Sequence, residues 1–203
     1  LSPGRTGVDA VAIRHAVPLA AAVAPEVSIG WRNVQYSGKR MGVRVTGTTG
    51  DVLQTNLLEI ESGRNLSDLD VDQASQVALI GSEVRDNIFP TNEDPIGKRI
   101  TVHGLPFTVV GLIKHYEFMQ GGRNALRWKN RNVYIPVSTA QKRFTGNEKL
   151  TGLAIRAVNA DSLSWQGSRR KPSFDGGRGS GIRASPRPRR WRKRSASRSS
   201  TSS

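Results

Sequence analysis

Two short stretches of the sequence contain residue types that bind phosphate or metal ions in proteins. The first, PIGKRI, contains the glycine-lysine pair Gly97 and Lys98. A phosphate-binding loop needs another glycine five residues before Gly97 and a serine or threonine directly after the lysine. Those positions hold Asn92 and Arg99. Because both requirements fail, the sequence does not predict a nucleotide site here.

The second stretch, DLDVD, spaces Asp68, Asp70 and Asp72 as in the opening of a calcium loop. The turn glycine and the final glutamate of such a loop would fall at Gln73 and Leu79, so two necessary groups are missing. We therefore interpret the stretch as the solvated start of a short acidic helix, where the helix dipole favours carboxylates.

Other residue types that carry catalysis lack the neighbours they need. His15, His103 and His115 show no metal-ligand spacing and no obvious carboxylate partner. No serine lies in a nucleophile-elbow motif, and the absence of cysteine excludes disulfides and thiolate metal sites. The sequence therefore predicts no catalytic residue, no cofactor and no metal ligand.

A loop from Lys114 to Asn132 combines basic and aromatic residues. It contains five Lys and Arg residues but only one acidic residue, Glu117. Such a loop could bind an acidic partner or a lipid headgroup. The alternative is a flexible surface loop whose aromatic side chains cover a neighbouring hairpin. The candidate contact residues are Tyr116, Phe118, Arg123, Arg127, Trp128, Lys129 and Arg131.

The net charge of +15 is concentrated at one end of the chain. Residues 1–163 hold 19 Lys and Arg against 15 Asp and Glu, a net charge of +4. Residues 164–203 hold 12 against 1, a net charge of +11. The body is thus nearly balanced, and an anionic partner is suggested by the tail alone.

The tail, residues 164–203, has two interpretations. Its Arg, Ser, Gly and Pro content predicts disorder, because too little apolar surface is available for a core. As a native segment it is similar to arginine-serine arms that contact nucleic-acid phosphates. Alternatively, the abrupt change in composition is typical of a GC-rich gene read in a wrong frame. We favour the frameshift, so nucleic acid is not the partner that we expect.

Apolar patterns indicate which elements position these residues. Strands are predicted at Ala20–Gln35, RMGVRVTG, QVALIG, NVYIP and LTGLAIRAVN. Helices or helical turns are predicted at Ala10–Ala16, Asp51–Gln54, after Ser67, after Ser82 as a capping residue, at Ser138–Phe144 and at ADSL. The clearest alternation of apolar and polar residues lies in GKRITVHGLPFTVVGLI, which predicts a hairpin with one apolar face and a turn at Gly104.

Four motifs follow one another in residues 9–163. They are DAVAIRHAVPLAAAVAPEV, VTGTTGDVLQTNLLEIESGRNLSDLDVDQASQVALIGSEVRDNIFP, DPIGKRITVHGLPFTVVGLI and NVYIPVSTAQKRF. In this order they resemble the extracytoplasmic core domain of MacB-type ABC transporter permeases, over about three quarters of the chain. The motif residues that the resemblance marks as structural are Gly63, Arg64, Asp70, Gly81, Asp94, Pro95, Gly97, Lys98, Gly104, Phe107 and Gly111.

The resemblance implies an α+β fold with two lobes in residues 1–163. A porter-like, βαβ-rich lobe would comprise residues 1–90 and 150–163. An inserted, strand-rich lobe would comprise residues 91–149, which include the hairpin and the basic loop. The disordered basic tail would follow.

The resemblance also implies a function without chemistry of its own. Such a domain lies on the periplasmic face of the bacterial inner membrane and couples cytoplasmic ATP hydrolysis to export through lobe movement, which is called mechanotransmission. Its partners would be the rest of the permease with an ATP-binding domain or subunit, a second copy and, in some relatives, a MacA-like adaptor. Full-length relatives export antibiotics, peptides or lipoproteins.

The sequence departs from the family pattern in ways that keep two other functions open. We expect a fragment, because no run of about 18 apolar residues is present and the chain begins at Leu1. The closing helix and strand of the first lobe are replaced by the tail, and RWKNRN stands where the family has acidic residues before VYIP. The alternatives are a nucleic-acid-binding protein that uses the tail and a stand-alone periplasmic interaction module.

Overall fold

The structure, a computed structural model, describes residues 20–157 of the 203-residue chain. The chain divides into two units at Ser164, and every described residue belongs to the first. The strands are β1 (Ala20–Tyr36), β2 (Lys39–Thr48), β3 (Ile60–Gly63), β4 (Val77–Ile80), β5 (Arg99–Val102), β6 (Leu105–Ile113), β7 (Met119–Gln120), β8 (Arg123–Asn124), β9 (Asn132–Pro136) and β10 (Gly152–Ala157). The helical segments are α2 (Val52–Thr55), α3 (Asp68–Asp72), α4 (Ser82–Ile88), α5 (Arg127–Asn130), α6 (Val137–Ala140) and the π-helical turn η1 (Gln141–Thr145).

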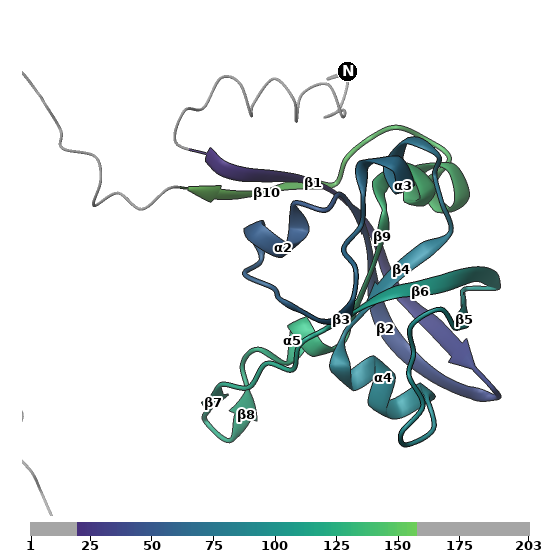
Figure 1. Ribbon diagram of the computed structural model, residues 1–203. Helices are drawn as coiled ribbons and strands as arrows, with labels where there is room; N and C mark the ends of the chain where they lie inside the picture. Colours follow the sequence, from purple (N-terminus) through teal and green to yellow (C-terminus); the bar gives the residue numbers. More distant parts are fainter. Residues whose placement is uncertain (1–19, 158–203) are drawn as a thin grey trace, which may run out of the picture. The chain divides into compact units, whose positions relative to one another are not determined.

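One mixed sheet of eight strands organises the described residues (Figure 1). Its strand order is β10-β1-β2-β9-β4-β6-β3, and β5 pairs with both β1 and β6. β2 pairs parallel with β9 and β4 pairs parallel with β6, whereas the other neighbours are antiparallel. β7 and β8 form a separate two-stranded hairpin that projects from the sheet.

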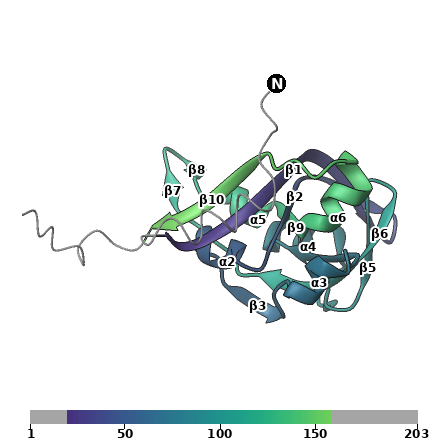
Figure 2. The same cartoon turned by 90° about the horizontal axis from the view of Figure 1, so that it is seen from above.

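The long strand β1 joins several parts of this sheet. It pairs with β10 first and with β2 afterwards, and near its end it also pairs with β5. β1 and β10 run side by side in both views (Figure 2). The register to β2 shifts between Ser28 and Gly30, where Gly30 has a φ of +82°. This is a β-bulge, which increases the local twist and so lets one long strand serve several neighbours.

The central strands carry apolar side chains on both faces, because successive residues of a strand point to opposite sides. On one face, Ile80 and Val133 belong to the larger core, to which α4 and α6 also contribute. On the other face, Leu79 and Tyr134 belong to a smaller core with Val52 of α2. The continuous apolar run of β4 follows from this double burial.

The strands and the hairpin predicted from apolar patterns are confirmed. In the hairpin of β5 and β6, Ile100, Val102, Phe107 and Val109 are fully buried, and Leu105 is half-buried. The acidic helix after Ser67 is also confirmed, and Asp68 and Asp72 are exposed as expected, but Asp70 is buried rather than solvated. The predicted helix from Ser138 to Phe144 is observed as α6 followed by η1. The mixed α/β, strand-rich fold is therefore as expected.

Two local predictions are wrong. Ser82 does not cap α4, since the N-cap is Gly81 and no side-chain capping bond is formed. The Ser82 hydroxyl lies instead 3.0 Å from His115 Nδ1, a contact across 33 residues that a local pattern cannot reveal. In addition, the segment from Lys114 to Asn132 is no featureless loop, because it contains β7, β8 and α5.

Some predictions concern residues that the structure does not describe. The helix at Ala10–Ala16, the helix opening at ADSL and the disordered tail all lie outside residues 20–157. The two-lobe division stays a prediction as well. Residues 91–149 contribute β5, β6 and β9 to the same sheet as β1, β2 and β4. Within residues 20–157, every helix is too short or too polar to cross a bilayer.

Candidate functional site

The structure brings Arg64 and Asp70 together at the corner that follows β3. Arg64 donates from Nη1 to Asp70 Oδ2 at 2.6 Å and from Nη2 to Oδ1 at 3.1 Å. The Ser67 backbone N–H donates to the Asp70 carboxylate and the Asp70 N–H donates to the Ser67 hydroxyl oxygen, and these two bonds form a capping box at the start of α3. The Ser67 hydroxyl also donates to Asp70 Oδ2 at 2.7 Å. The Arg64 guanidinium, aided by Ser67, lowers the pKa of Asp70 to about 2. This bidentate pair thus ties the end of β3 to α3.

Two of the motif glycines lie where backbones approach closely. A Cβ on Gly111 of β6 would lie 2.3 Å from the carbonyl oxygen of Arg64, and one on Gly63 would lie 2.3 Å from that of Val110. A Cβ on Gly81 would lie 2.3 Å from the carbonyl oxygen of Asn130. At these distances only glycine fits without a backbone shift. These positions therefore carry structure and no chemistry.

The DPIGK motif forms the turn that leads into β5. The Asp94 carboxylate accepts from the Ile96 N–H at 3.0 Å, as in an Asx turn. Lys98 pairs with Glu93 at 2.9 Å, and Glu93 also accepts from the Tyr36 hydroxyl at 2.6 Å. Pro95 lies in the same turn, and Gly97 and Gly104 have positive φ. Phe107 is buried and its ring stacks against Phe144.

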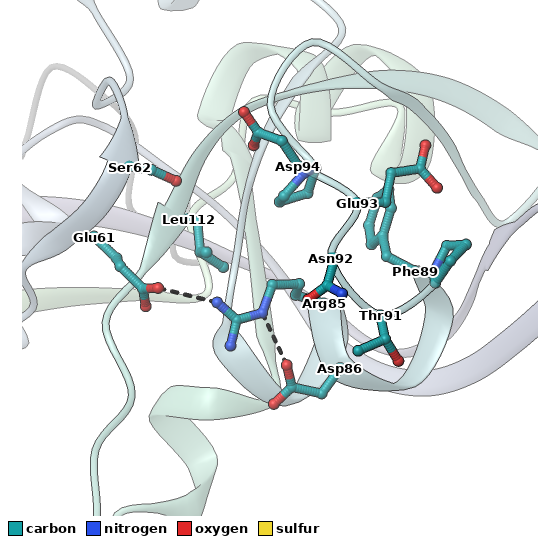
Figure 3. A pocket seen from close by; sticks show the side chains of 12 residues that line it. Glu61, Ser62, Arg85, Asp86, Phe89, Thr91, Asn92, Glu93, Asp94 and Leu112 are labelled. Atoms are coloured by element: carbon teal, nitrogen blue, oxygen red, sulfur yellow. Dashed lines mark hydrogen bonds and ion pairs between the residues drawn. The ribbon is translucent and has the colours of Figure 1, made fainter.

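An open cavity of about 600 Å³ lies between β3, α4 and the loop after α4 (Figure 3). Arg85 stands between two carboxylates of its wall, at 3.0 Å from Glu61 and 2.8 Å from Asp86. The hydrogen bond to Asp86, followed by the charge of both carboxylates, raises the pKa of Arg85 against the effect of burial. The described residues include no group of three or more acidic, histidine or cysteine side chains arranged to hold a metal ion. We assign no catalytic role to this cavity.

The basic loop uses much of its charge inside the domain. Arg127 forms a 2.6 Å ion pair with Glu83 of α4, and Arg131 lies 3.4 Å from the same carboxylate. Lys114 pairs with Glu59 at 2.8 Å. These acidic partners lie on other elements, so no spacing within the loop indicates them.

Lys129 is nearly buried although the sequence placed it in a contact loop. Its ammonium donates to the Leu57 carbonyl at 3.0 Å and lies 4.5 Å from the centre of the Tyr116 ring. Burial lowers the pKa of Lys129. By contrast, Phe118 and Trp128 are exposed, and Arg123 lies in the projecting β8. Tyr116 is half-buried and packs against the smaller core, which includes Ile113 of β6, so the aromatic residues of the loop are divided between the core and the surface. The role of the loop as a partner contact stays a prediction.

Sequence reasoning missed a second cavity, which is polar and lies over β1, β2 and β9. Its walls include Glu26, Arg44, Asn132, Tyr134 and the exposed Trp128. The available signal was the polar residues at alternate positions of strands whose other face is apolar. This signal is weak by itself, because such a face is usually solvated.

Comparison with known proteins identifies the family of this chain. A model of the family described as MacB-like periplasmic core domain matches residues 2–164. The macrolide export ATP-binding/permease protein MacB of Pectobacterium atrosepticum is 30% identical over 147 residues, which are 72% of this chain and 22% of that protein. A second relative, MacB 2 of Yersinia pestis bv. Antiqua, is 31% identical over 68% of this chain and 20% of its own length. The chain therefore spans about a fifth of these relatives.

Two solved structures share the fold. The periplasmic region of MacB from Actinobacillus actinomycetemcomitans matches with a TM-score of 0.62 and 21% identity, over 79% of this chain and 70% of that one. The extracellular domain of the noncanonic ABC-type transporter YknZ from Gram-positive bacteria also has a TM-score of 0.62, with 17% identity, over 79% of this chain and 77% of that one.

Proposed function

Because the chain belongs to the family of MacB-like periplasmic core domains, we propose that it is the extracytoplasmic domain of an ABC transporter permease that couples ATP hydrolysis to export. The match over residues 2–164 carries this proposal. Arg64 and Asp70, together with the close strand approaches at Gly63 and Gly111, would give the domain the rigidity needed to transmit movement.

The domain itself would be non-enzymatic. Its relatives are named ATP-binding/permease proteins, and this chain spans only about a fifth of their length. ATP hydrolysis would therefore lie on another domain or subunit of the transporter. The domain would lie at the periplasmic face of the bacterial inner membrane.

The mechanism would be mechanotransmission. Residues 1–90 and 150–163 would form one lobe and residues 91–149 the other, and ATP-driven dimerisation of the nucleotide-binding parts would move the lobes of two copies. A MacA-like adaptor is a further candidate partner. The surface that we assign to partner contact is the projecting β7–β8 hairpin with exposed Phe118 and Met119.

A chimeric transporter tests this function. Residues 2–164 would replace the matched segment of Pectobacterium atrosepticum MacB, and macrolide resistance and ATP hydrolysis would be measured in the same cells and membranes. We expect resistance above that of a control in which a Gly/Ser linker replaces the segment. A chimera that inserts and hydrolyses ATP but protects no better than the linker control would contradict the proposal.

The nucleic-acid-binding alternative depends on residues 164–203, which lie outside the described residues. No observation on residues 20–157 favours it, so we do not propose it.

A further inference from the structure

The polar cavity over β1, β2 and β9 has a volume of about 360 Å³. Its position follows from the strand register. Arg44 of β2 lies opposite Asn132 of β9, and Thr46 lies opposite Tyr134, so these four side chains share one face. The alternate residues of both strands belong to the larger core on the other face. The polar side chains are therefore held over a rigid, buried support.

Hydrogen bonds and burial act on three side chains of the polar cavity, Asn132, Tyr134 and Glu26. Asn132 donates from Nδ2 to the Tyr134 hydroxyl at 3.0 Å. Burial raises the pKa of Tyr134 from its ordinary value of 10.0 to about 12. Burial, the largest influence, raises the pKa of the Glu26 carboxyl, while the neighbouring Asn56 and Arg44 act to lower it.

Several hydrogen-bonding groups of the polar cavity remain available. Among residues 20–157, neither the Thr46 hydroxyl nor the Arg44 guanidinium forms a hydrogen bond. Trp128 lines the cavity with 44% of its surface exposed, so part of its indole is accessible beside these polar groups. A small binding site typically combines a concave shape with a few convergent polar groups of this kind.

The composition of the cavity wall selects the chemical class of the ligand. An anion would meet the Glu26 carboxylate, and a cation would meet the Arg44 guanidinium, so neither charge is favoured. A wholly apolar ligand would cover the Thr46 hydroxyl and the Arg44 guanidinium without giving either a hydrogen-bond partner, which is costly. A neutral ring with several hydroxyl groups satisfies these groups and can pack its C–H face on an indole.

We propose that the polar cavity binds a neutral polyhydroxylated ring, such as the glycosyl unit of a glycoside, with its hydroxyls on Thr46, Asn132 and Tyr134 and its C–H face on Trp128. The cavity volume of about 360 Å³ leaves room for one such ring. This inference does not depend on the export function, because binding requires neither ATP nor a membrane.

A titration of the full 203-residue chain tests the inference by nuclear magnetic resonance. The probe is methyl β-D-glucopyranoside, and the signals are the Trp128 indole N–H and the backbone amides of Thr46 and Gly152. Binding of a single sugar ring is expected in the millimolar range, as for other small ligands with few atoms. Sorbitol tests the need for a ring, and methylammonium and acetate test the exclusion of charge.

Matched variants identify the cavity as the binding site. Thr46→Val and Tyr134→Phe each remove one hydroxyl with little change in shape and should weaken binding about fivefold. Thr101→Val, on the distant β5, should bind as the original chain does.

Three results would overturn the inference: the absence of saturable shifts with the glucoside, shifts that are unchanged in both cavity variants, or stronger shifts with either charged probe. Equal binding of sorbitol would overturn the ring requirement. Loss of transport in the chimera with intact glucoside binding would instead refute only the export function.

Discussion

Replacing Asp70 by asparagine should destabilise the domain through the loss of a single ion pair. Asp70 is 9% exposed at its side chain and accepts two hydrogen bonds from the Arg64 guanidinium. Asparagine has nearly the same shape but carries no charge. The variant would therefore leave the corner between β3 and α3 in place and remove most of the attraction that holds it.

The size of the effect follows from the pKa of Asp70. Its fall from 3.8 to about 2 corresponds to roughly 2.5 kcal/mol of folding free energy, at 1.36 kcal/mol per pKa unit. Water screens this interaction, because the Arg64 side chain is 51% exposed. We therefore expect Asp70→Asn to lower the free energy of unfolding by about 1–2 kcal/mol, and the Tm by roughly 2–8 °C for a chain of this size.

The pH dependence provides a second signature. The folded pKa of Asp70 is lower than its unfolded value, so its contribution is complete above about pH 5 and is lost as the pH falls through the folded pKa of about 2. Urea unfolding at pH 7 should thus separate the variant from the original chain. The separation should shrink steadily in a series of measurements from pH 5 to pH 2.

Asp68→Asn is the matched control, because Asp68 lies in the same first helical turn but is exposed. This variant reports the effect of the helix dipole alone, which is about 0.3–1 kcal/mol. A double-mutant cycle with Arg64→Gln isolates the pair. Our reasoning is refuted if Asp70→Asn costs no more than Asp68→Asn at pH 7, or if its cost is independent of pH.

Two further substitutions test the packing and the surface charges. Gly111→Ala should lower the free energy of unfolding by about 3 kcal/mol or more, because its Cβ would lie 2.3 Å from the Arg64 carbonyl oxygen. Gly42→Ala is the control and should be close to neutral, because its Cβ would lie 3.9 Å from the nearest atom. Equal urea midpoints for the two variants would contradict the close approach at Gly111. Glu83→Gln removes the carboxylate that pairs with Arg127, whose side chain is 59% exposed. Because the pair is exposed, the variant should lower the free energy of unfolding in urea by only about 0.2–1 kcal/mol. A larger loss that persists in 1 M salt would show that the pair is not a surface ion pair.

Local signals in the sequence determined the elements of this domain. Alternation of apolar and polar residues predicted β2 and the β5–β6 hairpin, because a half-buried strand needs that period whatever its neighbours are. Ser67 and Asp70 indicated the start of α3, since both groups of a capping box lie within one turn. The family resemblance drew attention to Arg64 and Asp70 but showed no contact between them.

Tertiary structure alone decided how these elements meet. The parallel pairing of β2 with β9 joins residues almost 90 positions apart, so no local pattern encodes it. Ser82 is a good capping residue by type, yet its hydroxyl lies beside His115. The basic residues of the loop likewise looked available, although Arg127 and Lys129 have partners on α4 and beside α2.

The polar cavity shows most clearly which features the sequence determined and which the tertiary structure decided. The sequence determined that Arg44 and Thr46 share one face of a strand, and that Asn132 and Tyr134 share one face of another, because the side-chain period of a strand is two. Only the fold placed these faces next to each other and brought Glu26 and Trp128 to the same cavity. Periodicity acts between neighbours in the chain, whereas a binding site depends on contacts between distant segments, which form only when the whole core packs.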